Sequence, residues 1–197
     1  MNAPLMQKNY PLYLFCLFLI FLETLLQSLF ERDFLEEGSL RIALLKTARY
    51  TISGPLMLGA TLAGADIEVL KKLQMFGDNL GIAFQIQDDI LGVFGEEKAI
   101  GKSASSDIKE YKATILIAYA QKKGSKEQRG VLEKYYGDPG VSDEGVEEVR
   151  KVFRETGALE YANAQADVYF EKARMSLKGQ GEELLYSLVE FIKKRAR

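Results

Sequence analysis

Two adjacent aspartates, Asp88 and Asp89, are the residues of this sequence best suited to chemistry. They stand in the run GIAFQIQDDILG, which we interpret as part of a helix. At about 100° per residue, one narrow stripe of that helix holds Gly81, Gln85, Asp88 and Gly92, with Asp89 beside it. Adjacent carboxylates raise the pKa of one of them unless a cation neutralises the pair. Mg²⁺ binds one or two carboxylates together with water and phosphate oxygens, so we predict Mg²⁺ at this pair.

The surroundings of the pair favour a metal over a solvated surface position, which is the alternative and the commoner place for two aspartates. Phe84, Ile86 and Ile90 flank the aspartates, and the helix has no obvious polar face around them. Buried charges are usually paired or bound to a metal. We also expect the small glycine residues on the stripe to leave room for a ligand.

Lysines near this helix are candidate partners for a diphosphate, because an ammonium group is a flexible point charge. Lys102 follows Gly101 in a loop after the helix, and we expect Lys112 early in the next helix. Lys46 and Thr47 add an ammonium group and a hydroxyl group from an earlier segment. Each lysine alone is more often a solvated surface charge. Together with the aspartates, they indicate a site for diphosphate and magnesium.

Composition excludes several other classes of protein. The 197 residues contain no histidine, which rules out Ser-His-Asp and Cys-His catalysis. A single cysteine, Cys16, allows no disulfide framework within one chain. The net charge of −2 gives no reason to expect a nucleic-acid surface.

Helical patterns fill the chain, so we predict one all-α domain over residues 1–197. The expected helices cover about residues 12–34, 40–63, 67–94, 107–124, 126–136, 142–156, 158–177 and 182–197. Gly54-Pro55 is expected to kink the second of them, since proline lacks the N–H group. Glu36 to Ser39 and Gly95 to Ser106 are predicted loops. We predict Asp107, with Glu110 three residues later, and Ser142 as N-caps of the helices they precede.

The apolar run from Leu12 to Leu22 is too short to span a bilayer, which takes about 20 residues. We interpret it as a buried helix; a membrane-associated segment, or an effect of where the chain begins, is the alternative. Its continuation to Leu26 presents more apolar surface than one helix of a small domain buries alone, so we expect a dimer.

Several of these stretches resemble motifs of the trans-isoprenyl diphosphate synthases, with geranylgeranyl- and farnesyl-type enzymes most similar. KTARYT from Lys46, followed by Gly54-Pro55-Leu56 and Gly59-Ala60, looks like their lysine–threonine helix. The segment from Gly81 to Gly95 is similar to their second aspartate-rich motif. Gly101-Lys102, Ser106-Asp107-Ile108 and Lys112-x-Thr114 follow at the family's spacing, and Gly157-Ala158-x-x-Tyr161-Ala162 resembles a C-terminal element. The resemblance covers about residues 40–197.

The resemblance implies an all-α, isoprenoid-synthase-type helical bundle and a cytoplasmic enzyme that condenses isopentenyl diphosphate with an allylic diphosphate. Carried over to this sequence, it makes Asp88 and Asp89 ligands of Mg²⁺ and gives Lys102 and Lys112 to the allylic diphosphate. It also places Lys46, Thr47 and Gln85 at the reacting centre and Phe84 against the isopentenyl unit. It further implies pairing, as a homodimer or with a homologous synthase subunit.

Two departures from the family's pattern qualify this expectation. Gly92 stands where a third aspartate is common in the second motif. The sequence has no second Asp-Asp pair and no Arg-Arg, so the first aspartate-rich motif and the arginines after it are missing. We therefore expect a fold that is incomplete at the N-terminus and a chain that is weak or inactive alone. The alternatives are a non-catalytic partner subunit of a full-length synthase and a terpene synthase of the same fold.

Overall fold

The computed structural model describes residues 36–95, 105–177 and 183–194, and within these ranges every regular element is a helix. In chain order the helices are α2 (Glu36–Ile42), η1 (Ala43–Ser53), α3 (Gly54–Leu62), α4 (Ile67–Phe94), α6 (Ser106–Lys109), α7 (Ile115–Lys123), α8 (Lys126–Tyr135), α9 (Asp143–Glu155), α10 (Ala158–Ser176) and α11 (Glu183–Lys194). The predicted all-α class is confirmed. The predicted helix over residues 12–34 with its apolar run from Leu12 to Leu22, and residues 96–104 of the predicted loop with Lys102, lie outside the described residues.

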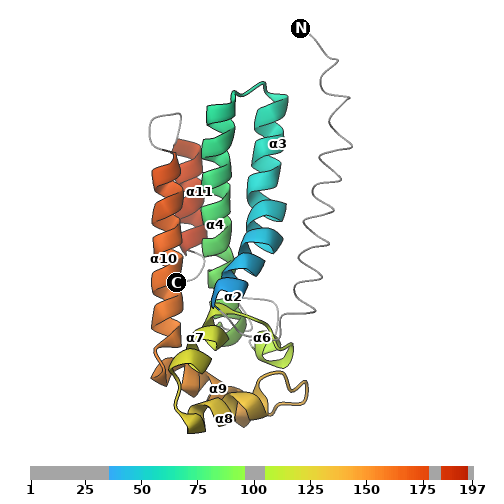
Figure 1. The fold of residues 1–197 in the computed structure, drawn as a ribbon, viewed down its shortest axis with the longest axis vertical. Helices are drawn as coiled ribbons and strands as arrows, with labels where there is room; N and C mark the ends of the chain where they lie inside the picture. The colour runs from blue at the N-terminus through green and yellow to red at the C-terminus, as the bar shows by residue number, and fades with distance from the viewer. Residues whose placement is uncertain (1–35, 96–104, 178–182, 195–197) are drawn as a thin grey trace.

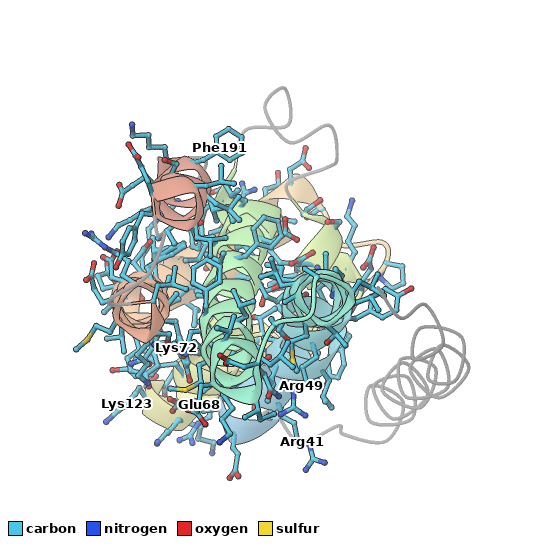
Figure 2. All side chains as sticks on the ribbon, turned by 90° about the horizontal axis from the view of Figure 1, so that it is seen from above. Arg41, Arg49, Glu68, Lys72, Lys123 and Phe191 are labelled. Carbon is cyan, nitrogen blue, oxygen red and sulfur yellow. The ribbon has the colours of Figure 1, made fainter. Side chains whose placement is uncertain are left out.

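Helix α4 is the centre of the bundle (Figure 1). It runs between α3 and α10, with α11 beside it, while α7, α8 and α9 close one end. Its side chains supply much of the core: Phe76, Leu80, Ala83 and Val93 are fully buried. Seen along the bundle in Figure 2, charged residues such as Arg41 and Lys123 lie at the rim, and so does Phe191 of α11. Helix α4 is thus the central element of the bundle, against which other helices pack.

The predicted bounds of α4 are confirmed at both ends, Ile67 and Phe94. The carboxylate of Asp66 accepts a hydrogen bond of 2.9 Å from the backbone N–H of Val69, which satisfies one of the free donors of the first turn. Gly95 has extended backbone angles and ends the helix. No proline interrupts the 28 residues between these ends.

The predicted second helix is three consecutive helices, and the predicted loop before it is wrong. Glu36 and Glu37 stand in the first turn of α2, where the helix dipole favours negative charge. The segment that carries Lys46 and Thr47 is a π-helix, η1, a rare form that is frequent at functional sites. Regular α-helical geometry resumes at Gly54, with proline in the first turn of α3, where its missing N–H costs no hydrogen bond.

The prediction of one helix from Asp107 to Gly124 is also wrong. Ser105, not Asp107, is the N-cap of α6, which is only four residues long. Tyr111 follows with φ of 56°, a left-handed conformation that ends the helix. Thr114 then caps a separate helix, α7, by accepting from the backbone N–H of Ile117. The backbone carbonyl of Lys112, between the two helices, accepts a hydrogen bond of 2.6 Å from the hydroxyl of Tyr136, a residue distant in the chain.

The predicted helix cap at Ser142 and the predicted break at Gly157 are confirmed, and the predicted break between residues 177 and 182 lies outside the described residues. Ser142 caps α9 by accepting a hydrogen bond from the backbone N–H of Gly145. Gly157 has φ of 75° between α9 and α10, a conformation that glycine adopts without strain. Among the helices within the described ranges, none combines the length and the apolar character needed to cross a membrane.

Candidate functional site

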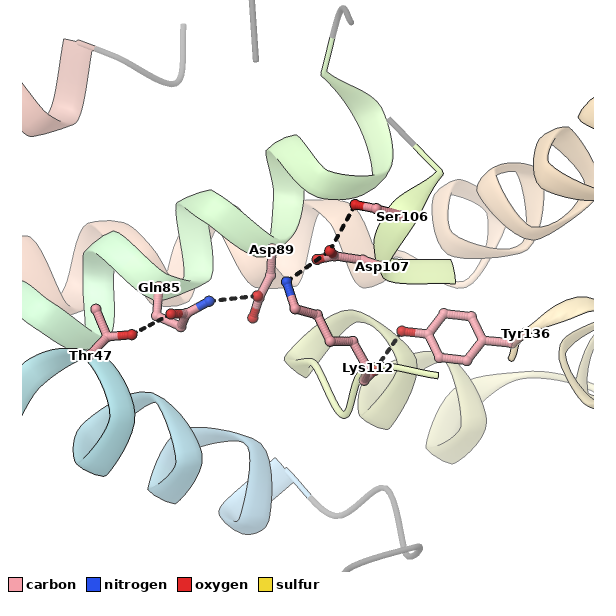
Figure 3. A network of polar contacts seen from close by, with 7 residues as sticks. All are labelled: Thr47, Gln85, Asp89, Ser106, Asp107, Lys112 and Tyr136. Atoms are coloured by element: carbon pink, nitrogen blue, oxygen red, sulfur yellow. Dashed lines mark hydrogen bonds and ion pairs between the residues drawn. The ribbon is translucent and has the colours of Figure 1, made fainter. Parts of the chain in front are cut away.

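Three polar side chains join η1 to α4 in a line of hydrogen bonds (Figure 3). The hydroxyl of Thr47 donates to Oε1 of Gln85. Nε2 of Gln85 donates in turn to Oδ1 of Asp89, one helical turn further on, at 2.8 Å. Thr47 and Asp89 are 7% and 8% exposed, so both ends of the line are buried. The amide of Gln85 is thereby oriented, with its donor toward the carboxylate and its acceptor toward the hydroxyl.

Close packing of η1 on α4 makes this line possible. A Cβ atom at Gly81 would lie 2.2 Å from the Cα of Ala48, and one at Gly77 would lie 2.6 Å from the Cα of Ser53. Each distance is far below van der Waals contact, so the two backbones approach only because these residues are glycine. The expectation that Gly81 leaves room for a ligand is therefore wrong. Its space is filled by η1, which brings Thr47 to Gln85.

A second polar group lies beside Asp89 and comes from α6 and the segment after it. Nζ of Lys112 is 2.7 Å from Oδ1 of Asp107, and the Lys112 ammonium points toward Asp89 as well (Figure 3). Asp107 is only 3% exposed, whereas Lys112 is half-buried, so the carboxylate is the buried partner of this ion pair. The hydroxyl of Tyr136 holds the backbone carbonyl of Lys112 and so fixes the start of the side chain.

Electrostatics at Asp89 show an excess of negative charge. Burial raises the pKa of Asp89 to about 7, against the opposing effects of the Lys112 charge and the Gln85 hydrogen bond. The nearby Asp107 and Asp88 carboxylates raise it further. Burial acts to lower the pKa of Lys112, but the hydrogen bond and charge of Asp107 outweigh burial, and the net shift is upward. Three carboxylates thus share one lysine.

These carboxylates fit a hard divalent cation in their chemistry. Oxygen ligands and uncompensated negative charge are what Mg²⁺ prefers. Within the described residues no three acidic side chains are grouped closely enough to hold a metal ion by themselves. Asp88 and Asp89 would therefore be joined by oxygen atoms of water or of a phosphate, as Mg²⁺ sites commonly are.

An apolar groove of about 760 Å³ opens on another side of α4, between α3 and α11. Its lining includes Phe84 and Leu73 of α4, Leu56 of α3 and Ile192 of α11. Phe84 also lines a small hollow together with Asp88. Phe84 therefore borders both the apolar groove and the hollow that Asp88 lines.

The structure brings together most of the predicted site residues that it describes. Thr47, Gln85 and Asp89 form the hydrogen-bonded line, and Lys112 approaches it from the other side. Phe84 and Asp88 share the hollow on the groove side. Lys46 is exposed on η1 and takes no part in these contacts.

Two residues of the polar group were not predicted as part of the site. Asp107 was interpreted as a helix cap, and Tyr136 was seen only as the end of a helix. A signal for Asp107 was present, because Asp107 stands five residues before Lys112 and next to the apolar Ile108. No local pattern marks Tyr136, since its contact is with a residue 24 positions away.

Comparison with known proteins agrees with the resemblance that the sequence motifs indicate. The model of the polyprenyl synthetase family matches residues 20–156. A geranylfarnesyl diphosphate synthase of Aeropyrum pernix is 36% identical over 146 residues, which are 71% of this chain and 45% of that protein. A geranylgeranyl diphosphate synthase of Saccharolobus solfataricus is 36% identical, with 74% and 43% covered. A heptaprenyl diphosphate synthase component 2 of Geobacillus stearothermophilus is 32% identical, with 73% and 45% covered.

Solved structures agree in fold. The geranylgeranyl pyrophosphate synthase of Corynebacterium glutamicum, complexed with isoprenyl diphosphate and magnesium, matches with a TM-score of 0.88 and 27% identity over 99% of this chain and 56% of that one. A polyprenyl synthase of Caulobacter crescentus CB15, complexed with calcium and isoprenyl diphosphate, has a TM-score of 0.84 and 26% identity, with 96% and 59% covered. The chain thus spans less than half the length of the curated relatives named above. On the family match and these likenesses, the chain belongs to the polyprenyl synthetase family.

Proposed function

We propose that this chain is a trans-prenyltransferase subunit that binds an isoprenyl diphosphate with Mg²⁺ and acts in the condensation of isopentenyl diphosphate with an allylic diphosphate. A geranylgeranyl-type product is the proposed outcome. The observation that carries the proposal is the buried Asp89, tied through Gln85 to Thr47 and placed beside Lys112, on a helix whose other side borders an apolar groove. Charged groups suit a diphosphate, and the groove suits a hydrocarbon tail.

The proposed reaction breaks the C–O bond of the allylic diphosphate, and the electron pair leaves with the diphosphate. The double bond of isopentenyl diphosphate then attacks the allylic carbon and a C–C bond forms. A neighbouring C–H bond breaks, its electron pair forms a new double bond, and the proton passes to the released diphosphate or to water. Mg²⁺ held by Asp88 and Asp89 would supply positive charge to the leaving diphosphate. The ammonium groups of Lys112 and Lys102 would add to that charge. Electrostatic stabilisation of the developing anion is the main way in which such a site can accelerate the reaction.

The remaining predicted residues have positioning roles in this proposal. Thr47 and Gln85 orient the carboxylate of Asp89 through their hydrogen bonds. Lys46, exposed beside Thr47, would reach a diphosphate only from the solvent side. Phe84 would lie against the isopentenyl unit, and the apolar lining next to it would keep water from a carbocation.

We expect little or no elongation by this chain alone. One Asp-Asp pair stands in the whole sequence, and each Mg²⁺ takes one or two carboxylates, so the pair holds few of the cations that a diphosphate can accept. A loss of about 4 kcal/mol in transition-state stabilisation slows a reaction roughly a thousandfold. The loss of further metal ligands would reduce the rate at least that much.

The test has two parts, binding and turnover. Inorganic diphosphate with Mg²⁺ should raise the melting temperature of the chain, and Asp88→Ala should abolish the rise. Labelled isopentenyl diphosphate with an allylic diphosphate should give product only slowly. An unchanged shift in the Asp88→Ala protein would remove the metal site from the proposal. Turnover near about 1 per second would instead show that other residues replace the missing aspartates.

A second candidate is a partner subunit that pairs with a full-length synthase. Two observations favour it: the single Asp-Asp pair, and the likeness to a protein named as one component of a heptaprenyl synthase. Mixing the chain with a full-length synthase from the same organism should then change the rate or the product length of that enzyme. Sedimentation of the chain alone separates this pairing from a homodimer.

A further inference from the structure

Asp107 and Gly92 are in direct contact, and the contact is possible because residue 92 has no side chain. A Cβ atom at Gly92 would lie 2.4 Å from Oδ2 of Asp107 and 2.6 Å from its Cγ. The carboxylate of Asp107, on α6, therefore lies against α4. It fills the space that a Cβ atom would take if position 92 held any residue other than glycine. The expectation that Gly92 leaves room for a ligand is wrong in this respect, because an aspartate of the same chain fills the room.

The two oxygens of Asp107 differ in their partners. Oδ1 accepts from Nζ of Lys112 at 2.7 Å and from the hydroxyl of Ser106 at 3.3 Å. Oδ2 is buried and has no hydrogen-bond partner among the described residues. A buried carboxylate oxygen without a partner is costly, so its position against Gly92 calls for a reason other than stability.

We propose that Asp107 is a positioning residue that uses the space above Gly92 to hold the ammonium group of Lys112 beside Asp89. Three observations carry the proposal: the ion pair of Asp107 with Lys112, the close approach of the Asp107 carboxylate to Gly92, and the direction of Lys112 toward Asp89 in Figure 3. The benefit of this arrangement to diphosphate binding rests on the proposed function. The positioning itself does not, and it is tested separately.

The geometry also gives a role to Gly92, which stands where a third aspartate is common in the second aspartate-rich motif. A charged group is present at this place, but it comes from α6 rather than from α4. It is engaged with a lysine, so it places a positive charge near the aspartate pair instead of adding a free metal ligand.

The first experiment measures how fast Lys112 is acetylated by acetic anhydride in the ligand-free chain at fixed pH, read by mass spectrometry of its peptide. Asp107→Asn keeps the side-chain shape but removes the charge, and we expect acetylation about three- to tenfold faster. Gly92→Ala should give a smaller increase, because the added methyl displaces the carboxylate, the flexible end of a side chain. Gly130→Ala is the matched control: the site is in α8 and a Cβ there meets no atom within 4 Å, so Lys112 should react as in the unaltered chain.

The double variant decides whether Gly92 acts through Asp107. If glycine matters only as space for the carboxylate, Gly92→Ala should have no further effect on Lys112 in the Asp107→Asn background. An unchanged acetylation rate in Asp107→Asn would overturn the proposal. So would an effect of Gly92→Ala that persists without the carboxylate. Should Asp107→Asn fail to fold, Gly92→Ala alone carries the test, and a rate equal to that of Gly130→Ala overturns the proposal.

The second experiment titrates inorganic diphosphate into the folded proteins in the presence of Mg²⁺ by calorimetry. Affinity should fall about tenfold in Asp107→Asn and less in Gly92→Ala, with Gly130→Ala unchanged. A purely structural role for Asp107 would lower the melting temperature but leave the affinity of the folded protein the same, and this result would count against the proposal. Failure of the unaltered chain to bind diphosphate would contradict the proposed function, while the acetylation rates would still decide the positioning role.

Discussion

The two sides of α4 near the aspartate pair differ in how they are built. On one side Gln85 and Asp89 are buried and hydrogen-bonded, and neighbouring elements reach them through close contacts at Gly81 and Gly92. On the other side Phe84 borders an open groove of about 760 Å³. The first side is fixed in place by packing, whereas the second is a space with apolar walls. A small change of shape should therefore disturb the polar side much more than the groove.

The comparison also separates the two parts of the proposed substrate. A diphosphate group needs charges held at defined positions, which is what packing on the polar side provides. A hydrocarbon tail needs only apolar area, which the groove provides without precise contacts. A change confined to one side of α4 should therefore spare the other side.

The largest effect is expected from Gly81→Ala. The new methyl would meet the backbone of Ala48 at 2.2 Å, so η1 must move away from α4 and the core beside it must rearrange. We expect a loss of about 3 kcal/mol in the free energy of unfolding, measured by urea denaturation with circular dichroism. Gly130→Ala is the control and should be neutral or stabilising by up to about 1 kcal/mol. Equal stability of the two variants would show that the helices are not packed as described.

The next effect concerns the charged ligand. Mg²⁺ and diphosphate at about 100 times the dissociation constant should stabilise the chain by about 2.7 kcal/mol, and Asp89→Ala should remove most of this gain. Asp167→Ala, which removes an exposed carboxylate from α10, should leave the gain intact. Thermal unfolding with and without ligand measures both. An equal loss in the two variants would mean that general negative charge, not this position, is responsible.

The groove is tested by filling it. Gly59 of α3 lines the groove and has open space beside it, so Gly59→Phe should fold normally and occupy part of the volume. We expect the affinity for farnesyl diphosphate to fall about tenfold, which is about 1.4 kcal/mol, while the affinity for inorganic diphosphate stays the same. Calorimetric titration of both ligands gives the comparison. A parallel loss of both affinities would show that the two sides of α4 are not independent.

The smallest effect is expected in the pH dependence of the free energy of unfolding, measured without metal, to which Asp89 on the polar side contributes. Because the pKa of Asp89 is raised to about 7 in the folded chain, the folded state holds its proton more strongly than the unfolded state does. This group therefore favours folding at low pH and loses its contribution as the pH rises to about 7. Between pH 6 and pH 8 we expect a loss of about 1 kcal/mol in EDTA, from urea unfolding. Asp89→Asn should abolish this part of the slope, and a slope that persists in full would assign it to other groups.

Much of the frame of this protein follows from local sequence. The bounds of α4 follow from the cap at Asp66, from the absence of proline and from the glycine at its end. The cap at Ser142 and the turn at Gly157 likewise depend only on neighbouring residues. The aspartate pair and its apolar flanks are the local signal for the candidate site, because an adjacent pair of charges in an apolar helix needs compensation wherever it is found.

What the sequence could not determine depends on residues that are distant in the chain. Gly81 and Gly92 were interpreted as free space, but Ala48 and Asp107 occupy that space. Asp107 has the local pattern of a helix cap, yet it is a buried residue of the four-residue helix α6 and pairs with Lys112.

The physical reason is the same in each case. A local pattern records which face of a helix is apolar and where its end groups are satisfied, since both depend on residues within a turn or two. Which atoms of another helix fill the space beside a given residue depends on how closely the two backbones approach. That approach was decided by the tertiary packing of η1 and α6 against α4.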